Sequence, residues 1–310
     1  MKIKTLKTLI VGSGGYVGSA VAARLLEDGH DVHGLARTAE IAERIQTAGL
    51  KPVVGSFDDP SALGELASDF DCVVFSPNIF PIALEMAPLK AILDKMEGSC
   101  RTFAYCSGTN VFSKTTRDGS WHHMSYSEYD MPQPPVWGTP KLACEKLVLA
   151  AAQRDVRAMI IRPPLIWGNG GSSQVPKTFA SVKATGAACY IGKGLHTYSN
   201  VHVEDLAEVF RLAIDRGIAG AAYHAVAGEA NYRTIAEAVA RVMGCSTRSI
   251  SFDEACDIWN PWYVMFGMSA NSRTRAERTT SELGWVPKHT DLIDDILHGS
   301  YRRVFGEGAF

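Results

Sequence analysis

The segment Thr8-Leu9-Ile10-Val11-Gly12-Ser13-Gly14-Gly15-Tyr16-Val17-Gly18 decides the fold of this chain. A short apolar run leads into a glycine-rich turn, and the following residues repeat apolar side chains at the spacing of one helical face. Glycines at positions 12, 15 and 18 suit a tight turn that brings backbone amides and a helix N-terminus against a pyrophosphate. The order of strand, turn and helix therefore predicts a dinucleotide site, and its expected residues are Gly12, Ser13, Gly15, Tyr16, Val17 and Gly18.

Alternation of strand-like and helical segments continues beyond this turn. Strands are expected at 8–11, 31–36, 51–55, 72–75, 102–106, 157–161 and 223–226, and helices at 17–28, 41–48 and 141–154. Such alternation is typical of a parallel sheet with helices on both faces. We therefore expect an α/β fold with a doubly wound, Rossmann-type sheet.

The pattern loosens after Arg162-Pro163-Pro164, where a segment rich in glycine, asparagine and serine spans 168–173. We expect a dinucleotide-binding domain over 1–165, with 200–228 returning to it, and a small interleaved C-terminal substrate lid made of 166–199 and 229–310. The boundary between such a lid and the ends of the sheet is the usual place for a ligand cleft.

Composition excludes several classes of function. The 310 residues carry 31 Lys and Arg against 33 Asp and Glu, so a globally basic nucleic-acid binder is not expected. No apolar run approaches the ~18 residues of a membrane span. The seven cysteines form no C-x-x-C pair, which favours reduced thiols and a cytoplasmic protein. A small molecule is therefore the expected partner.

The end of the second expected strand, Leu35-Ala36-Arg37-Thr38, selects the dinucleotide. An acidic residue there would bind the adenosine ribose of NAD, but alanine stands at that position and Arg37 follows. A guanidinium can clamp a 2′-phosphate with charge-assisted hydrogen bonds. NADP(H) is therefore favoured, although Arg37 could also be an ordinary surface cation. Ser56 and Phe57, after the third strand, are placed to cover the adenine.

Several segments together resemble the extended short-chain dehydrogenase/reductase family, in an atypical form related to NAD(P)-dependent epimerases and dehydratases. The resemblance covers essentially the whole chain and rests on the glycine turn and on residues 105–112, 162–168, 201–207 and 282–287. It implies further cofactor contacts from Ser76, Pro77, Lys141 and Pro163. It also suggests a homodimer formed through 92–96 and 142–152.

The family's catalytic Tyr-x-x-x-Lys pair is incomplete here. Lys141 is present, with Glu145 one turn later, and the resemblance gives this lysine the role of holding the nicotinamide ribose. The residue four positions earlier is Trp137, whose indole cannot act as an acid or base. Pro140 suggests that the helix begins with Thr139 as its N-cap, which would leave Trp137 outside the helix.

The hydroxyl that polarises the substrate in this family falls within Ser107-Gly108-Thr109, and the best register places glycine there. Ser107 or Thr109 could serve instead, or both could cap the end of the strand. Tyr126, in the loop 121–129, is a candidate replacement for the missing tyrosine, although such residues are more often packing residues. The pair His122-His123 has no accompanying carboxylates at ligand spacing, so no metal is expected.

We therefore expect an NADP(H)-dependent oxidoreductase that acts on a carbonyl or activated alkene of a small apolar or aromatic substrate. The apolar character is inferred from aromatic residues expected near the cleft, which could equally be lid core: Trp121, Trp137, Trp167, Trp259, Trp262 and Phe266. Two alternatives stay open. One is an NADP-binding redox sensor or partner-binding protein without turnover, and the other is an epimerase or isomerase that uses bound cofactor transiently.

Overall fold

The computed structural model describes residues 5–77, 79–132 and 138–306. Its centre is a parallel sheet of seven strands. In spatial order these are β11 (Ala222–His224), β7 (Arg157–Arg162), β5 (Thr102–Cys106), β4 (Cys72–Phe75), β1 (Lys7–Val11), β2 (Asp31–Ala36) and β3 (Lys51–Val54). The chain reverses its direction of travel across the sheet between β1 and β4, which opens a crevice at the carboxyl ends of these strands.

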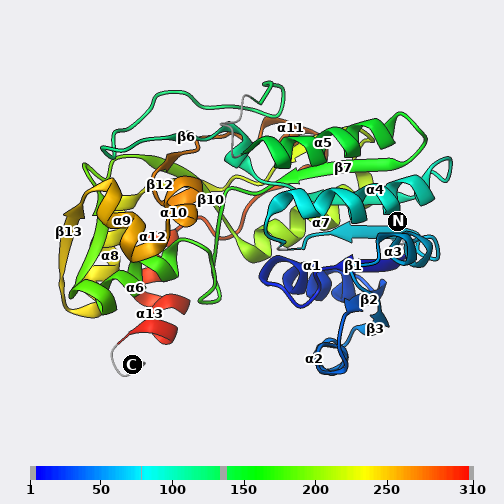
Figure 1. The fold of residues 1–310 in the computed structure, drawn as a ribbon, viewed down its shortest axis with the longest axis horizontal. Helices are drawn as coiled ribbons and strands as arrows, with labels where there is room; N and C mark the ends of the chain where they lie inside the picture. Colours follow the sequence, from blue (N-terminus) through cyan, green and yellow to red (C-terminus); the bar gives the residue numbers. More distant parts are fainter. Residues whose placement is uncertain (1–4, 78, 133–137, 307–310) are drawn as a thin grey trace.

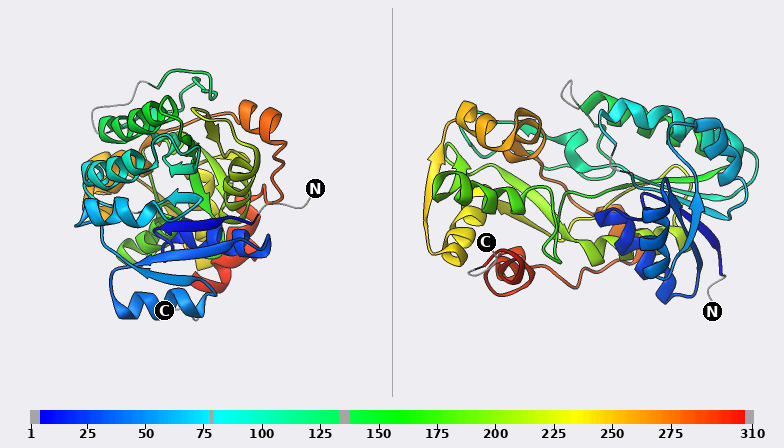
Figure 2. Two further views of the ribbon diagram at one scale, coloured as in Figure 1. Left: turned by 90° about the vertical axis from the view of Figure 1, so that its right-hand side faces the viewer. Right: turned by 60° about the horizontal axis from the view of Figure 1, so that its bottom comes forward.

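Helices cover both faces of this sheet because its buried side chains alternate along each strand. Ile10 and Val74 face α1 (Tyr16–Glu27), α2 (Ala39–Thr47) and α7 (Val203–Arg216). Leu9 and Val73 face α3 (Pro60–Ala67), α4 (Met86–Met96) and α5 (Thr139–Ala152). In the right-hand view of Figure 2, the cyan and green helices α4 and α5 lie above the strands of the sheet, and the dark blue helix α1 lies below them. The expected doubly wound α/β fold is confirmed.

A second hydrophobic core lies beside this sheet, at the other end of the molecule in Figures 1 and 2. Its strands form small sheets: β8 (Leu165–Trp167), β10 (Thr197–His202) and β12 (Gly228–Asn231) in one, and β9 (Ala187–Ile191) and β13 (Ser246–Ile250) in another. The helices packed there are α6 (Val175–Thr185), α8 (Tyr232–Met243), α9 (Phe252–Trp259), α12 (Leu292–His298) and α13 (Ser300–Phe305).

Short elements connect the two regions. They are η1 (Ile82–Glu85), η2 (Thr109–Phe112), α10 (Pro261–Tyr263), η4 (Val264–Met268) and α11 (Glu277–Leu283), together with the strand pair β6 (Lys114–Thr115) and β14 (Ala270–Asn271). No helix in the described ranges is both long and apolar enough to cross a lipid bilayer.

The start of α5 differs by one residue from the sequence prediction. Gly138 is the N-cap, and Thr139 already has helical conformation rather than capping the helix. Pro140 lies in the first turn, as expected, where its missing amide proton costs no hydrogen bond. Trp137 lies outside the described residues.

Candidate active site

The glycine turn after β1 leaves no room for a side chain at position 12 or 18. Gly12 has φ +97°, and a Cβ on it would lie 2.6 Å from the carbonyl oxygen of Ser76. A Cβ on Gly18 would lie 2.1 Å from the carbonyl oxygen of Gly12. The amide of Gly15 donates to that same carbonyl at 2.9 Å. Glycine is therefore required at positions 12 and 18 by steric contact and backbone geometry.

Hydrogen-bond donors remain available at the end of this turn. Gly15 is the N-cap of α1 and provides no capping side chain, and the first turn of the helix has no acidic residue. The hydroxyl of Ser13 is buried and has no hydrogen-bond partner among the described residues. Free amides at a helix N-terminus and an unpartnered hydroxyl suit an anion. The turn therefore fits the pyrophosphate of a dinucleotide.

The loop 168–173 lies against this turn. The hydroxyl of Tyr16 donates to the carbonyl of Gly168 at 2.6 Å, and the ring of Tyr16 packs so closely on Gly171 that a Cβ there would lie 2.3 Å away. Tyr301, from α13, accepts a hydrogen bond from the amide of Gly168 at 3.2 Å and donates to the carbonyl of Gly171. The glycine turn, this loop and the C-terminal helix are thus joined by hydrogen bonds.

The expected adenosine end of the site lies at the neighbouring strands β2 and β3. Arg37 directly follows β2 and is exposed, and no described carboxylate forms an ion pair with it. The hydroxyl of Ser56, after β3, donates to Asp58 at 3.0 Å. Phe57 packs edge-on against Phe75, with ring centroids 6.4 Å apart. The structure therefore brings Arg37, Ser56 and Phe57 to adjacent strand ends.

Lys141 is held by the carboxylate of Glu85, a residue that no sequence motif marks. Its ammonium lies 2.9 and 3.1 Å from the two carboxylate oxygens of Glu85, on η1, and the hydroxyl of Tyr105 donates to Glu85 at 2.7 Å. The side chain of Glu85 is only 3% exposed and that of Lys141 11%. Burial, followed by the charge of Glu85, raises the pKa of Tyr105 well above its usual value, so Tyr105 keeps its proton.

The hydroxyls of Ser107 and Thr109 are both engaged in internal hydrogen bonds. Ser107 donates to Glu145 at 2.6 Å, and the same carboxylate accepts two hydrogen bonds from Arg162 at 2.9 and 2.7 Å. Ser272 donates to the carbonyl of Thr109, so Thr109 donates its own proton to the hydroxyl oxygen of Ser272 at 3.1 Å. Neither hydroxyl has a second proton for a substrate oxygen.

The remaining predicted site residues lie around this centre. Ser76 and Pro77 contact Gly12 directly, and the carbonyl of Pro163 accepts a hydrogen bond from the amide of Thr109 at 2.9 Å. The ring of Tyr126 stacks on Phe112 at a centroid distance of 5.0 Å. Tyr126 is therefore a packing residue in the described structure, and its catalytic role stays a prediction.

Four of the aromatic residues expected near the cleft fall into two groups, and Trp121, which is 52% exposed, belongs to neither. Trp167 and Trp259 are buried in the second core, where their indole N–H groups bind Asn200 and the carbonyl of Lys177.

Trp262, on α10, instead contacts Phe80 from the loop after β4, with ring centroids 4.3 Å apart. Trp262 also contacts Phe266 on η4, and Phe80 is 60% exposed. We call Phe80, Trp262 and Phe266 the aromatic bridge, because it joins the two regions.

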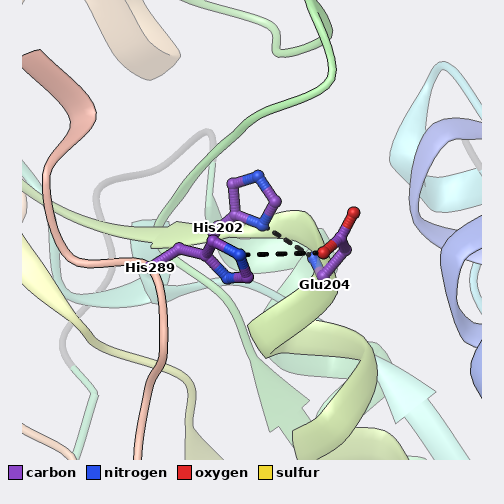
Figure 3. A group of neighbouring side chains, drawn as sticks. All are labelled: His202, Glu204 and His289. Carbon is purple, nitrogen blue, oxygen red and sulfur yellow. Dashed lines mark hydrogen bonds and ion pairs between the residues drawn. The ribbon is translucent and has the colours of Figure 1, made fainter. Parts of the chain in front are cut away.

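One group of side chains in the described ranges has the composition of a metal site: His202, Glu204 and His289 (Figure 3). The Nδ1 atom of His202 already accepts the backbone N–H of Glu204 at 3.3 Å, which caps α7. The two imidazole rings stack at 4.2 Å, and His289 lies beside the carboxylate of Asp205. This arrangement docks the C-terminal segment on α7, and we assign no metal chemistry to it.

Comparison with known proteins agrees with the fold. The model of the NAD dependent epimerase/dehydratase family matches residues 8–227. An uncharacterized protein of Schizosaccharomyces pombe is 30% identical over 305 residues, which cover 96% of this chain and 100% of that protein. The 4-hydroxy-2-methyl-3-oxo-4-farnesyl-3,4-dihydroquinoline-1-oxide ketoreductase of Stigmatella aurantiaca is 23% identical over 239 residues, 70% of this chain and 67% of that protein.

Among solved structures, dTDP-glucose 4,6-dehydratase from Bacillus anthracis, in complex with NAD, superposes with a TM-score of 0.74. It is 15% identical and the match covers 96% of this chain and 95% of that one, so it shows the shared fold. The matched family model spans the glycine turn, Lys141 and the network around Glu145. The chain therefore belongs to the NAD dependent epimerase/dehydratase family of oxidoreductases and epimerases.

Proposed function

We propose that this protein is an NADP(H)-dependent reductase that acts on a carbonyl or activated alkene of a small apolar substrate. The observation that carries the proposal is the ammonium of Lys141, which a buried carboxylate holds in place. The same chain has a glycine turn that suits a pyrophosphate and an exposed Arg37 after β2. A pre-positioned ammonium of this kind suits the ribose hydroxyls beside a nicotinamide.

The preference for NADP(H) rests on Ala36 and Arg37. An acidic residue at the end of β2 would repel a 2′-phosphate, and this chain has none there. Arg37 is exposed and has no carboxylate partner among the described residues, so its guanidinium is free to bind a phosphate. This is our inference for the present chain, whereas the Bacillus anthracis dehydratase was solved with NAD.

A bound reduced nicotinamide would supply the hydride for the carbonyl carbon, with the C=O electron pair moving to oxygen and a proton completing the alcohol. The protein's own residues orient this reaction. Lys141 binds the ribose, while Glu85 fixes the position of Lys141. Since Trp137 stands where the family has tyrosine, we assign the proton to water, to the substrate or to Tyr126.

An apolar substrate is supported by the aromatic bridge. Phe80 follows β4, whose carboxyl end borders the crevice. Trp262 contacts Phe80 from the second region, and Phe266 contacts Trp262. Aromatic faces bind flat or bulky apolar groups better than they bind charged sugar nucleotides. The Stigmatella relative is named for the reduction of a farnesylated quinoline ketone, which agrees with this chemistry.

The proposal is tested by incubating the purified protein with NADPH or NADH and a panel of aryl ketones, alkyl ketones, enones and sugar nucleotides. We expect NADPH to be oxidised with an apolar ketone or enone, and more slowly or not at all with sugar nucleotides. Lys141→Met should abolish the reaction. Absence of NADPH oxidation with every compound would contradict a reductase.

A non-catalytic NADP-binding protein is the second candidate, and Trp137 at the tyrosine position favours it. It predicts tight NADPH binding without oxidation in the same panel. An epimerase predicts an isomerised substrate with no net consumption of NADPH. The three outcomes are distinguishable in one set of incubations.

A further inference from the structure

Gly108 stands at the end of β5, where the family resemblance places the substrate-polarising hydroxyl. Its backbone is extended, with φ −179° and ψ 153°, so any residue could adopt this conformation. A Cβ on Gly108 would lie 2.9 Å from Oδ1 of Asn110 and 3.7 Å from the carbonyl oxygen of Pro163. The carboxamide of Asn110 therefore fills the space of the missing side chain.

The side-chain carbonyl oxygen of Asn110 lacks a hydrogen-bond donor in the described part of the chain. This atom, Oδ1, is also buried. An unsatisfied buried acceptor destabilises the folded state, so its retention calls for a reason. The local turn does not supply one, because Ser113 binds the backbone carbonyl of Asn110, at 3.1 Å through its amide and at 2.8 Å through its hydroxyl.

The neighbouring hydroxyls do not compete for this role. Ser107 gives its proton to Glu145, and Thr109 gives its proton to Ser272. Asn110, which follows Thr109, thus has a buried acceptor, Oδ1, that no described group uses. This atom lies beside position 108, where the family resemblance puts the substrate-polarising hydroxyl.

We propose that the carboxamide of Asn110 hydrogen-bonds to the reacting oxygen of the substrate, in place of the hydroxyl that the family carries at position 108. This inference rests on the proposed function and adds a catalytic residue to it. The Oδ1 atom, which faces position 108 in the structure, would accept from the product alcohol, and the NH2 group would donate to the carbonyl oxygen of the substrate after a half-turn of the amide about Cβ–Cγ. Because an amide does not titrate, this contribution is independent of pH.

The first test is Asn110→Ala. We expect kcat to fall about 100-fold, because a donor to the developing oxyanion is removed. NADPH affinity and thermal stability should be unchanged or slightly higher, since the variant removes an unsatisfied acceptor rather than a contact. Full turnover in Asn110→Ala would overturn the inference, and so would a large loss of stability that accounts for the lost activity.

The second test restores the hydroxyl. In the Asn110→Ala background, the space beside Gly108 is free, so Gly108→Ser fits and should recover most of the lost kcat. The matched control, Gly108→Ala in the same background, fills the same space without a hydroxyl and should stay as slow as Asn110→Ala. In the presence of Asn110, a Cβ at position 108 would lie 2.9 Å from Oδ1, so Gly108→Ser displaces the carboxamide from its place. Equal kcat in the serine and alanine double variants would overturn the inference.

A binding measurement separates this inference from the proposed function. If the wild-type protein oxidises NADPH with no ketone, the proposed function fails. Aryl ketones and their alcohols are then titrated into protein loaded with NADP+, with the heat of binding as the readout. We expect about tenfold weaker binding by Asn110→Ala, which corresponds to the loss of one hydrogen bond. Equal behaviour of wild type and variant, including no binding by either, would overturn the role of Asn110.

Discussion

The ammonium of Lys141 lies 2.9 Å from Oε2 of Glu85, and both side chains are largely buried. The two residues are 56 positions apart, on α5 and on η1. Tyr105 completes the arrangement, because its hydroxyl donates to Glu85 and its ring lies 5.0 Å below the ammonium. Lys141 is thus held in place before any ligand arrives.

The ion pair of Lys141 and Glu85 predicts that protein stability and NADPH affinity respond differently to substitution. Lys141→Met leaves the carboxylate of Glu85 buried and unpaired, and we expect a loss of about 3–5 kcal/mol in the free energy of unfolding. Lys141→Met/Glu85→Gln should regain most of that stability without regaining NADPH affinity. Urea denaturation and NADPH titration measure the two quantities. A Lys141→Met protein as stable as wild type would contradict the pairing.

The glycine turn provides a matched pair of substitutions. A Cβ on Gly18 would clash with the Gly12 carbonyl, whereas a Cβ on Gly14 meets nothing within 4 Å. We expect Gly18→Ala to lose about 1–3 kcal/mol of stability and to lose dinucleotide binding. Gly14→Ala should keep its stability within about 0.5 kcal/mol. Equal melting temperatures for the two variants would contradict the described turn.

Removal of Arg37 tests the choice of dinucleotide. We expect Arg37→Ala to weaken NADPH binding about 10- to 100-fold, because hydrogen bonds to a charged phosphate are lost. NADH binding should not change. Arg241→Ala, which removes an exposed cation from α8, is the charge-matched control and should leave both affinities unchanged. An unaltered ratio of NADPH to NADH affinity in Arg37→Ala would contradict the proposed specificity.

His196 predicts a pH dependence of stability. It is fully buried, its Nε2 lies 2.7 Å from the carbonyl oxygen of Met268, and burial lowers its pKa to about 4. The unfolded chain takes up a proton near pH 6.5, but the folded chain does not until about pH 4. Stability is therefore complete above pH 6.5 and falls as the pH drops toward 4, by on the order of 3 kcal/mol from this residue.

Urea denaturation across this pH range checks the prediction. The pKa of buried His224 is lowered to about 4 as well, so the wild-type protein carries both contributions. His196→Phe keeps a ring against Tyr232, on which His196 stacks at 4.5 Å, but removes the titrating group. The slope of its stability against pH should be smaller than that of wild type by one proton. An unchanged slope would show that His196 does not resist protonation.

The central sheet could be predicted because its signals are local. Strands such as β4 and β5 point alternate side chains toward the two helix layers. The glycines at positions 12 and 18 lie close together in the sequence, in the same loop and helix start. Asp59 before Pro60 is an equally local signal, since Asp59 caps α3, but this helix was not among those expected from the sequence. An N-capping residue followed by proline is a sequence signal that predicts the start of this helix.

The contacts that define the candidate active site are not local. Glu85 belongs to no recognisable sequence motif, and only the tertiary fold brings its carboxylate to the ammonium of Lys141. Tyr16 and Gly168 are 152 residues apart, and Ser107 and Glu145 are 38 apart. The sequence therefore indicates which residues are candidates, while their hydrogen-bond partners, and hence the availability of each hydroxyl, follow only from the structure. Asn110 illustrates this, because only the structure shows that its Oδ1 atom is buried beside Gly108 and has no partner among the described residues.

The most direct test of the account follows a hydrogen atom. NADPH deuterated at the transferable position of nicotinamide C4 is incubated with the protein and the best apolar ketone of the panel, and the product is examined by mass spectrometry and NMR. Hydride transfer from the dinucleotide predicts one deuterium on the carbinol carbon of the product alcohol and an equal amount of NADP+. Deuterium that stays in the dinucleotide, with no alcohol formed from any ketone or enone, would contradict it.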